Sequence, residues 1–209
     1  MAMAYRKEDL DLAALLAEHG ANGTDALLVA AGKNDTAGCL FALAAGANVN
    51  VTVDGKPLLS VAAVYGHVNV VRLFLERGAD PNLADGSGIT TLGRLIRRGG
   101  TEEKCLFELL EHGADANTVR PDAGTTPLHD AVIKNDMTAA TVLLSDGARV
   151  NAACRGSGYT ALHLASSEEM RNLLLAAGAT RGSVGAPASA AQADLAVPPE
   201  RAALACVAS

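Results

Sequence analysis

The chain has 209 residues, of which 49% are hydrophobic and 3% aromatic, with no tryptophan and a formal net charge of −6 at pH 7. This length suits one sizeable domain, and an apolar content made mainly of Ala, Leu and Val favours closely stacked helices. The acidic balance argues against a nucleic-acid-binding protein, whose domains are usually strongly basic.

Several features indicate the cellular compartment. The N-terminal twelve residues contain no apolar core of a secretory signal peptide. No apolar run approaches the roughly 18 residues that a membrane span requires. Four cysteines, Cys39, Cys105, Cys154 and Cys206, are scattered without a Cys-x-x-Cys pair. We therefore expect a reduced compartment, cytoplasmic or nuclear.

A leucine-rich stretch that ends in glycine recurs along the chain. The glycines are separated by 26, 32, 35, 34 and 31 residues, a drifting period that is typical of stacked supersecondary units. The recurring stretches are Leu15–Asn22, Phe41–Asn50, Leu73–Asn82, Glu108–Asn117, Val142–Asn151 and Leu173–Gly182, with glycines Gly20, Gly46, Gly78, Gly113, Gly147 and Gly178.

Each unit predicts two helices. The leucine-rich helix ends at glycine, which tolerates the left-handed helix stop, and an Asn-containing extended segment follows. A short Ala-rich helix then begins at Thr, and Thr126–Pro127 fits the N-cap and first helical position. A break at Gly66–His67 or Asn135–Asp136 leads into the next leucine-rich helix. No unit could bury its apolar face alone, so the stack itself forms the core.

The pattern resembles the ankyrin repeat. The carrying residues are "TPLH" at Thr126–His129, "TALH" at Thr160–His163, the recurring Gly-Ala-x-x-Asn, and "YGHVNVVRLFLERGADPN" at Tyr65–Asn82. The resemblance covers about residues 8 to 179 and implies an all-α solenoid of stacked helix-turn-helix units joined by short hairpin turns.

We expect five repeats plus an N-terminal half-repeat at Tyr5–Gly20, within an ankyrin-repeat domain of residues 1–180. The third repeat is irregular at its glycine pair, 99–100, and the last has no Gly-His break. Three repeats lack the histidine of "TPLH", and their hairpin turns should be less fixed; the replacing residues are Leu28, Ser60 and Gly93. Residues 181–209 are rich in Ala, Pro, Ser and Gly and predict a flexible tail.

The histidines and cysteines could suggest chemistry, but each has a simpler structural interpretation. The resemblance gives His129 and His163 a role in bonding the turn that opens a repeat, and no ligand-spaced Cys, Asp or Glu accompanies either. The other three, His19, His67 and His112, also occupy framework positions. Cys39 and Cys105 are expected to be buried, and Cys154 to be exposed in a turn. We predict no cofactor, no metal and no catalytic residue.

Basic residues indicate a binding surface. In the ankyrin architecture, the turn tips and the outer side of each first helix line one concave face. The residues in phase with that face are Lys33, Lys56, Tyr65, Arg97, Arg98, Lys134, Arg155 and Tyr159, with Asp54 and Asp122 as acidic exceptions. Most other acids lie on the second helices. This row of basic residues, the basic stripe, should attract an acidic segment of another protein. Alternatively, these cations only keep the successive turns soluble and bind no partner.

The last four residues, from Cys206 to Ser209, fit a prenylation signal of the farnesyl type. A single prenyl chain without a polybasic cluster would anchor the protein only weakly. Membrane association is therefore expected only if Cys206 is modified.

Three hypotheses follow for the function. The first is a non-catalytic protein–protein interaction module, acting as an adaptor, scaffold or inhibitor, and expected to be a monomer. The second is a membrane-recruited adaptor or host-directed effector that is tethered through Cys206. The third is an enzyme with a site in the irregular third repeat, around Gly99–Lys104. We favour the first, because no paired carboxylates, nucleophile–base set or cofactor motif is present.

Overall fold

The computed structural model describes residues 23–99, 102–155 and 157–180, and within these ranges the chain forms five consecutive pairs of helices. The first helix of each pair is α2 (Gly23–Gly32), α4 (Leu58–Val64), α6 (Thr91–Arg98), α8 (Pro127–Ile133) or α10 (Ala161–Leu164). The second is α3 (Thr36–Ala44), α5 (Val68–Glu76), α7 (Glu103–Glu111), α9 (Met137–Ser145) or α11 (Glu168–Ala176). Strands β1 (Thr52–Val53) and β2 (Lys56–Pro57) form a short antiparallel hairpin.

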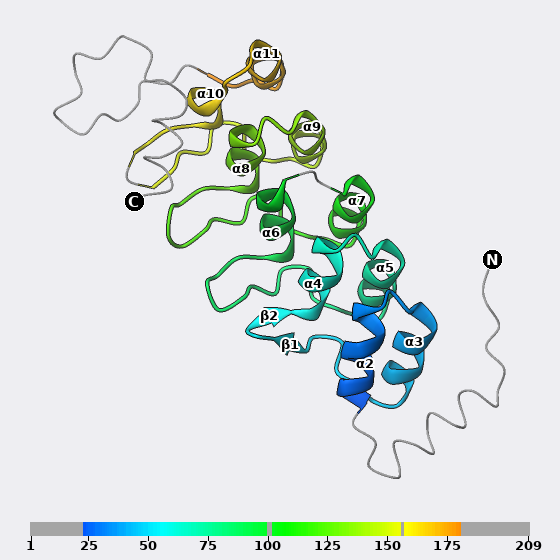
Figure 1. Ribbon diagram of the computed structural model, residues 1–209. Helices are drawn as coiled ribbons and strands as arrows, with labels where there is room; N and C mark the ends of the chain where they lie inside the picture. Colours follow the sequence, from blue (N-terminus) through cyan, green and yellow to red (C-terminus); the bar gives the residue numbers. More distant parts are fainter. Residues whose placement is uncertain (1–22, 100–101, 156, 181–209) are drawn as a thin grey trace.

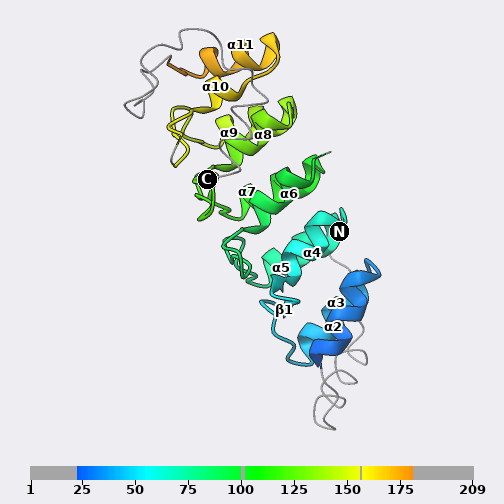
Figure 2. The ribbon, with the colours of Figure 1, turned by 60° about the vertical axis from the view of Figure 1, so that its left-hand side comes forward.

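The pairs stack side by side into an elongated solenoid (Figure 1). Helix α4 packs against α6, α6 against α8, and α8 against α10, while α5 and α9 pack on either side of α7. The first helices form one row, next to the hairpins and loops, and the second helices form the other (Figures 1 and 2). This arrangement confirms the predicted all-α solenoid and its five repeats.

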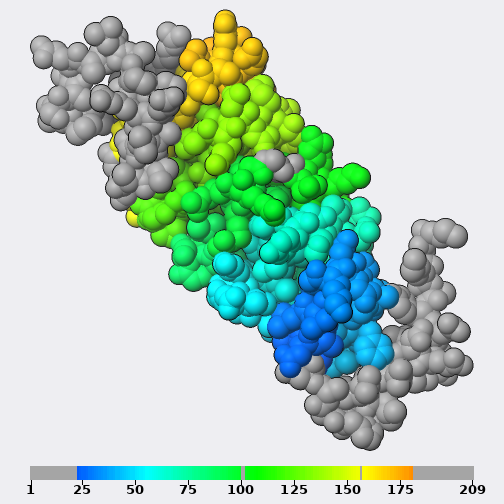
Figure 3. Space-filling view, in the orientation of Figure 1, coloured from blue at the N-terminus to red at the C-terminus, as the bar shows by residue number. Residues whose placement is uncertain are grey.

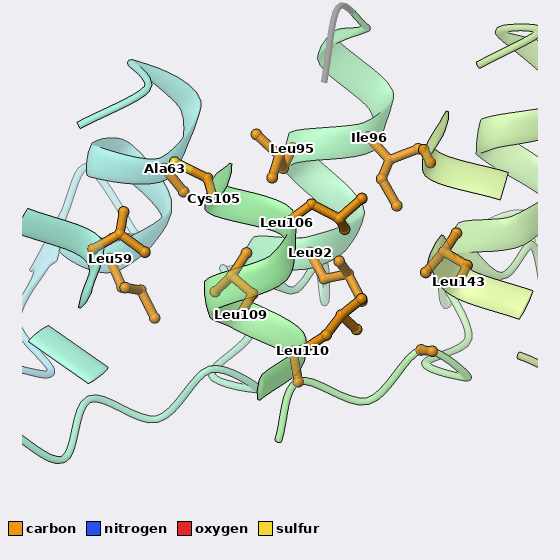
Figure 4. Close-up of a cluster of buried hydrophobic side chains, with 14 of the residues drawn as sticks. Leu59, Ala63, Leu92, Leu95, Ile96, Cys105, Leu106, Leu109, Leu110 and Leu143 are labelled. Atoms are coloured by element: carbon orange, nitrogen blue, oxygen red, sulfur yellow. The ribbon is translucent and has the colours of Figure 1, made fainter. Parts of the chain in front are cut away.

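The core runs continuously through the stack. Small side chains on the first helices, such as Ala63 in α4, are fully buried and let neighbouring repeats approach closely. Leucines of the second helices, such as Leu106 and Leu109 in α7, fill the space between the repeats. Figure 4 shows these side chains within one cluster that also includes Leu59 of α4 and Leu92 of α6. In space-filling form, the described repeats make one unbroken body (Figure 3).

Local backbone chemistry ends the second helix of each repeat at the glycine that the sequence predicted. The glycines that follow the second helices all adopt a positive φ, as a left-handed helix stop requires; they are Gly46, Gly78, Gly113, Gly147 and Gly178, with φ between 82° and 90°. Between the two helices of a repeat, the left-handed residue is Asn34, Gly66 or Asn135. The last repeat has no such residue in its break, and Ala165 there is extended instead.

Two hairpins differ from expectation. The repeat with Ser60 in place of histidine contains the β1–β2 pair, whose Asp54 and Gly55 have φ of 50° and 73°. An Asp-Gly pair with positive φ is the favoured chemistry of a two-residue hairpin, so the turn is fixed without the histidine. In the repeat with Gly93, the carboxylate of Asp85 organises the turn. The hairpin before Leu28 lies outside the described residues.

The structure does not test the predictions made for the two ends of the chain. The half-repeat at Tyr5–Gly20, His19, the tail 181–209 and the signal at Cys206 all lie outside the described residues. In the part that is described, no helix is both long and apolar enough to cross a membrane.

Candidate partner-binding face

The hairpins and the first helices together form one surface, called the hairpin face below. Successive hairpins contact each other directly. The amide of Gly86 donates a hydrogen bond of 3.2 Å to the carbonyl of Gly55 in the previous hairpin. Gly88 lies against Pro121, and Gly124 against Arg155, so closely that a Cβ at either glycine would fall 2.5 Å or less from its neighbour. These contacts make the hairpins a continuous, preformed row.

In the third repeat, Asp85 holds the hairpin and one arginine. Its Oδ1 accepts hydrogen bonds from the amides of Ser87, at 2.8 Å, and Ile89, at 3.0 Å. Its other oxygen forms an ion pair with the guanidinium of Arg94 in α6. Asp85 is 8% exposed, so this carboxylate is neutralised within the protein and leaves Arg94 oriented along the hairpin face.

In the fourth repeat, Arg120 is buried between two carboxylates. Its Nε donates to Asp122 Oδ1 at 3.0 Å, and its Nη1 lies 3.6 Å from Oδ1 of Asp130. The bond from Arg120 holds the pKa of Asp122 below its usual range. Burial raises the pKa of Asp130 to about 6, against the opposing attraction of Arg120, Arg97 and Lys134. Burial therefore makes the Asp130 carboxyl easier to protonate than Asp122, although with a pKa of about 6 it is still mostly ionised at pH 7.

The structure places the predicted binding residues along the hairpin face. Arg97 and Arg98 occupy the last turn of α6, and Lys134 is the C-cap of α8. All six predicted cations are exposed, whereas Tyr159 is only partly exposed; the other cations are Lys33, Lys56 and Arg155. Contacts bring together Tyr65, Arg97, Arg98 and Lys134, while among the described residues no ring contact or shared cleft joins Lys33 or Lys56 to this group.

The two predicted tyrosines have different surroundings. Tyr65 is 67% exposed at the end of α4, and the guanidinium carbon of Arg98 lies 5.8 Å from the centre of its ring. This cation–π contact joins the second and third repeats and holds Arg98 in place. Each tyrosine also lies against a histidine ring, Tyr65 against His67 at 5.9 Å and Tyr159 against His163 at 5.7 Å between centroids, but Tyr159 is only partly exposed. Of the two, Tyr65 is the better placed to contact a partner.

Two clefts open on the hairpin face at the third and fourth repeats. The larger, of about 350 Å³, is lined by Val64, Ile89, Arg94, Arg97 and Arg98. The smaller, of about 160 Å³, is lined by Arg97, Arg120, Asp130, Ile133 and Lys134. Because Arg97 lines both, the two clefts are neighbours.

The histidines have the structural role that the resemblance implied. His129 Nδ1 accepts a hydrogen bond of 3.1 Å from the amide of Thr126, and His163 does the same for Thr160 at 3.3 Å. Burial lowers the pKa of both imidazoles, so each is neutral at pH 7. Within the described ranges, no group of three or more His, Cys, Asp or Glu side chains is arranged to hold a metal ion.

The cysteines are interior residues. Burial raises the pKa of the Cys39 and Cys105 thiols to about 11, as expected for inert core positions. Cys154, expected to be exposed, is 3% exposed. Its amide and carbonyl form the hairpin bonds to Tyr159 and Gly158, which direct the side chain inward.

The third hypothesis placed an enzymatic site around Gly99–Lys104. The structure describes Gly99 and residues 102–104 of this segment, and the charged side chains of Glu102, Glu103 and Lys104 are all exposed.

The comparison with known families agrees with this architecture. The model described as "Ankyrin repeats (3 copies)" matches residues 1–85 and 92–182. The chain belongs to the ankyrin-repeat family. Ankyrin repeats use their extended surface for protein–protein interaction, so the domain is an interaction module.

Relatives of the ankyrin-repeat chain include two proteins named as cyclin-dependent kinase inhibitors. It is 34% identical over 115 residues to the rat cyclin-dependent kinase 4 inhibitor B, spanning 55% of this chain and 85% of that protein. It is 33% identical over 161 residues to the human cyclin-dependent kinase inhibitor 2A, spanning 74% of this chain and 97% of that protein. The match to the human BCL-6 corepressor-like protein 1 has 41% identity over 57% of this chain, but spans only 7% of that protein.

Two cleft-lining residues of the ankyrin domain are not predicted from the sequence. Arg94 and Arg120 line the clefts, although neither was assigned to the stripe. Arg120 is 7% exposed because Asp122 and Asp130 neutralise it, and a buried arginine is rare without such partners. In the sequence, Asp122 stands out as an acidic residue on a face of cations, and this position indicates a nearby basic partner such as Arg120.

Proposed function

We propose that the protein binds an acidic segment of another protein along its hairpin face and acts without catalysis, as an inhibitor or adaptor. One observation carries the proposal. Arg97, Arg98 and Lys134 are exposed on the hairpin face, and no carboxylate among the described residues forms an ion pair with any of them.

The distribution of opposite charge supports the same conclusion. Exposed glutamates lie on the second helices, away from this row, at Glu76, Glu103, Glu111, Glu168 and Glu169. A partner with an acidic segment would be attracted to the hairpin face and repelled by the other row, which favours one orientation of binding. The preformed hairpins need little ordering when the partner binds, so less entropy is lost.

The relatives that match over most of their length favour an inhibitor. Both are named as inhibitors of cyclin-dependent kinases, and this chain spans 85% and 97% of them. We therefore propose a protein kinase as the first partner to test. Purified cyclin-dependent kinase 4 should bind the chain in a pull-down assay and lose activity in proportion to the bound fraction. Full kinase activity with excess ankyrin protein would exclude this partner.

The general proposal is tested by affinity capture and mass spectrometry. The test variant carries Arg97→Glu, Arg98→Glu and Lys134→Glu. The control variant carries Arg77→Glu, Lys104→Glu and Arg149→Glu, which change the net charge equally at exposed positions on α7 and after α5 and α9. Proteins captured by the wild type and the control should be depleted with the test variant. Equal capture by all three would reject binding through the hairpin face.

A further inference from the structure

We propose that the two neighbouring clefts form one docking trough for a segment in which an apolar side chain lies next to a carboxylate. The trough consists of Val64, Ile89, Arg94, Arg97 and Arg98 together with Arg120, Asp130, Ile133 and Lys134. This inference rests on the proposed function and names the part of the partner that anchors it.

The continuity of the trough comes from Arg97. This residue lines both clefts, so a chain lying across the second, third and fourth repeats would pass over its guanidinium. Arg97 also lies close enough to Asp130 to lower the pKa of that carboxyl, although the two form no ion pair within 4 Å. The guanidinium thus remains available to a carboxylate from outside.

The charges within the trough divide into neutralised and unneutralised groups. Arg94 is paired with Asp85, and Arg120 with both Asp122 and Asp130. In contrast, the structure as described gives Arg97, Arg98 and Lys134 no ion-pair partner. The unneutralised cations lie at the open rim, and the paired arginines lie deeper. An incoming carboxylate therefore meets cations at the rim without having to break an internal pair.

The larger cleft provides the apolar half. Val64 is half-buried at the end of α4, and Ile89 is 9% exposed at the hairpin of the third repeat. The exposed ring of Tyr65 follows Val64 directly and carries Arg98 over its face. A volume of about 350 Å³ accepts a bulky apolar side chain. A carboxylate next to this apolar side chain in the partner would then reach Arg97 or Arg98. The trough therefore selects a segment that carries an apolar and an acidic residue close together.

Selection from a random twelve-residue peptide library displayed on phage tests this directly. Peptides enriched on the immobilised 209-residue protein should share an apolar residue within a few positions of Asp or Glu. Synthetic versions with Asp and Glu changed to Asn and Gln should bind about tenfold more weakly or worse. An enriched motif without an acid, or no enrichment above an unrelated surface, would overturn the proposal.

Variants locate the binding within the trough. Arg97→Glu should weaken the selected peptide about tenfold or more, and Val64→Thr, which keeps the side-chain shape, should weaken it a few-fold. The matched control Arg77→Glu, at an exposed position outside both clefts, should bind as the wild type does. Circular dichroism of each variant confirms folding, and a peptide insensitive to both trough variants contradicts the assignment.

The outcome is distinguishable from failure of the proposed function. If a captured protein depends on the triple reversal of Arg97, Arg98 and Lys134 but not on Val64→Thr or on Arg97→Glu alone, the hairpin face binds partners without the trough. If capture survives the triple reversal, both proposals fail.

Discussion

The side chain of Asn82 accepts a hydrogen bond of 2.8 Å from the backbone amide of Asp115, 33 residues further along the chain. Its amide group also donates to the carbonyl of Gly113 at 2.9 Å. The same pair of bonds recurs from Asn50, Asn117 and Asn151 to the next glycine-containing turn. Each asparagine therefore ties one repeat to its neighbour at the level of the backbone.

Removing one of these ties should weaken the stack. Asn82→Ala loses two hydrogen bonds to backbone groups, and we expect the free energy of unfolding to fall by about 1 to 3 kcal/mol. Urea unfolding followed by circular dichroism measures it. The control, Asn69→Ala, changes an exposed residue within α5 and should be neutral or slightly stabilising, since alanine is the better helix former. Equal midpoints for the two variants would contradict the role of Asn82.

The repeat architecture could be predicted from the sequence because it depends on chemistry that recurs. A glycine that must adopt φ near 85° can be replaced by few residues, so Gly78 and Gly113 mark the period on their own. The hairpins were predicted less well. Ser60 in place of the histidine predicts a loose turn, whereas Asp54–Gly55 fixes that turn by its own backbone preference.

The candidate site was predicted only in outline. Arg97, Arg98 and Lys134 follow from the repeat phase, because all three lie at the end of a first helix. The roles of Arg94 and Arg120 depend on which carboxylates they meet in space, Asp85 and Asp122 respectively. Pairings of this kind are particular to one repeat, so a pattern shared by all repeats does not reveal them.

The contact between Gly124 and Arg155 predicts a steric effect on the hairpin row. Gly124 has φ of +64°, and a Cβ there would lie 2.3 Å from Cβ of Arg155. Gly124→Ala should therefore combine backbone strain with displacement of the next hairpin, and lower the free energy of unfolding by more than about 2 kcal/mol.

The matched control is Gly147→Ala. Gly147 also has a positive φ, of 83°, but nothing lies within 4 Å of its Cβ position. This variant should show the strain alone, about 1 to 2 kcal/mol. Thermal or urea unfolding compares the two. If Gly124→Ala costs no more than Gly147→Ala, the hairpins of the fourth and fifth repeats are not in tight contact.

The interior cysteines predict low thiol reactivity. With a pKa of about 11, only about one Cys39 or Cys105 thiol in a thousand is ionised at pH 8, and the thiolate is the reactive form. Cys154 is shielded by burial. In a Cys206→Ser background, Ellman's reagent should label the native protein slowly and the urea-unfolded protein at once with three thiols. Rapid release of one equivalent from the native protein would show that Cys154 is accessible after all.

Asp130 predicts a pH dependence of stability with a defined sign. Burial raises its pKa from 3.8 to about 6, so the folded state binds this proton more tightly than the unfolded state does. The free energy of unfolding should therefore fall as the pH rises from about 4 to 6, by up to about 3 kcal/mol. An asparagine side chain at this position would mimic the protonated carboxyl, and Arg120 would keep Asp122 as its counterion.

The variant Asp130→Asn should thus be more stable than the wild type at pH 7.5 and about equal to it at pH 4, and urea unfolding across this range measures the difference. The control Asp146→Asn, at an exposed residue after α9, should follow the wild-type curve. Parallel curves for Asp130→Asn and the wild type would mean that the arginines stabilise the carboxylate fully. The trough would then keep the Asp130 anion below pH 6 as well as at pH 7, and binding of an incoming carboxylate would not strengthen as the pH falls from 7 to 5.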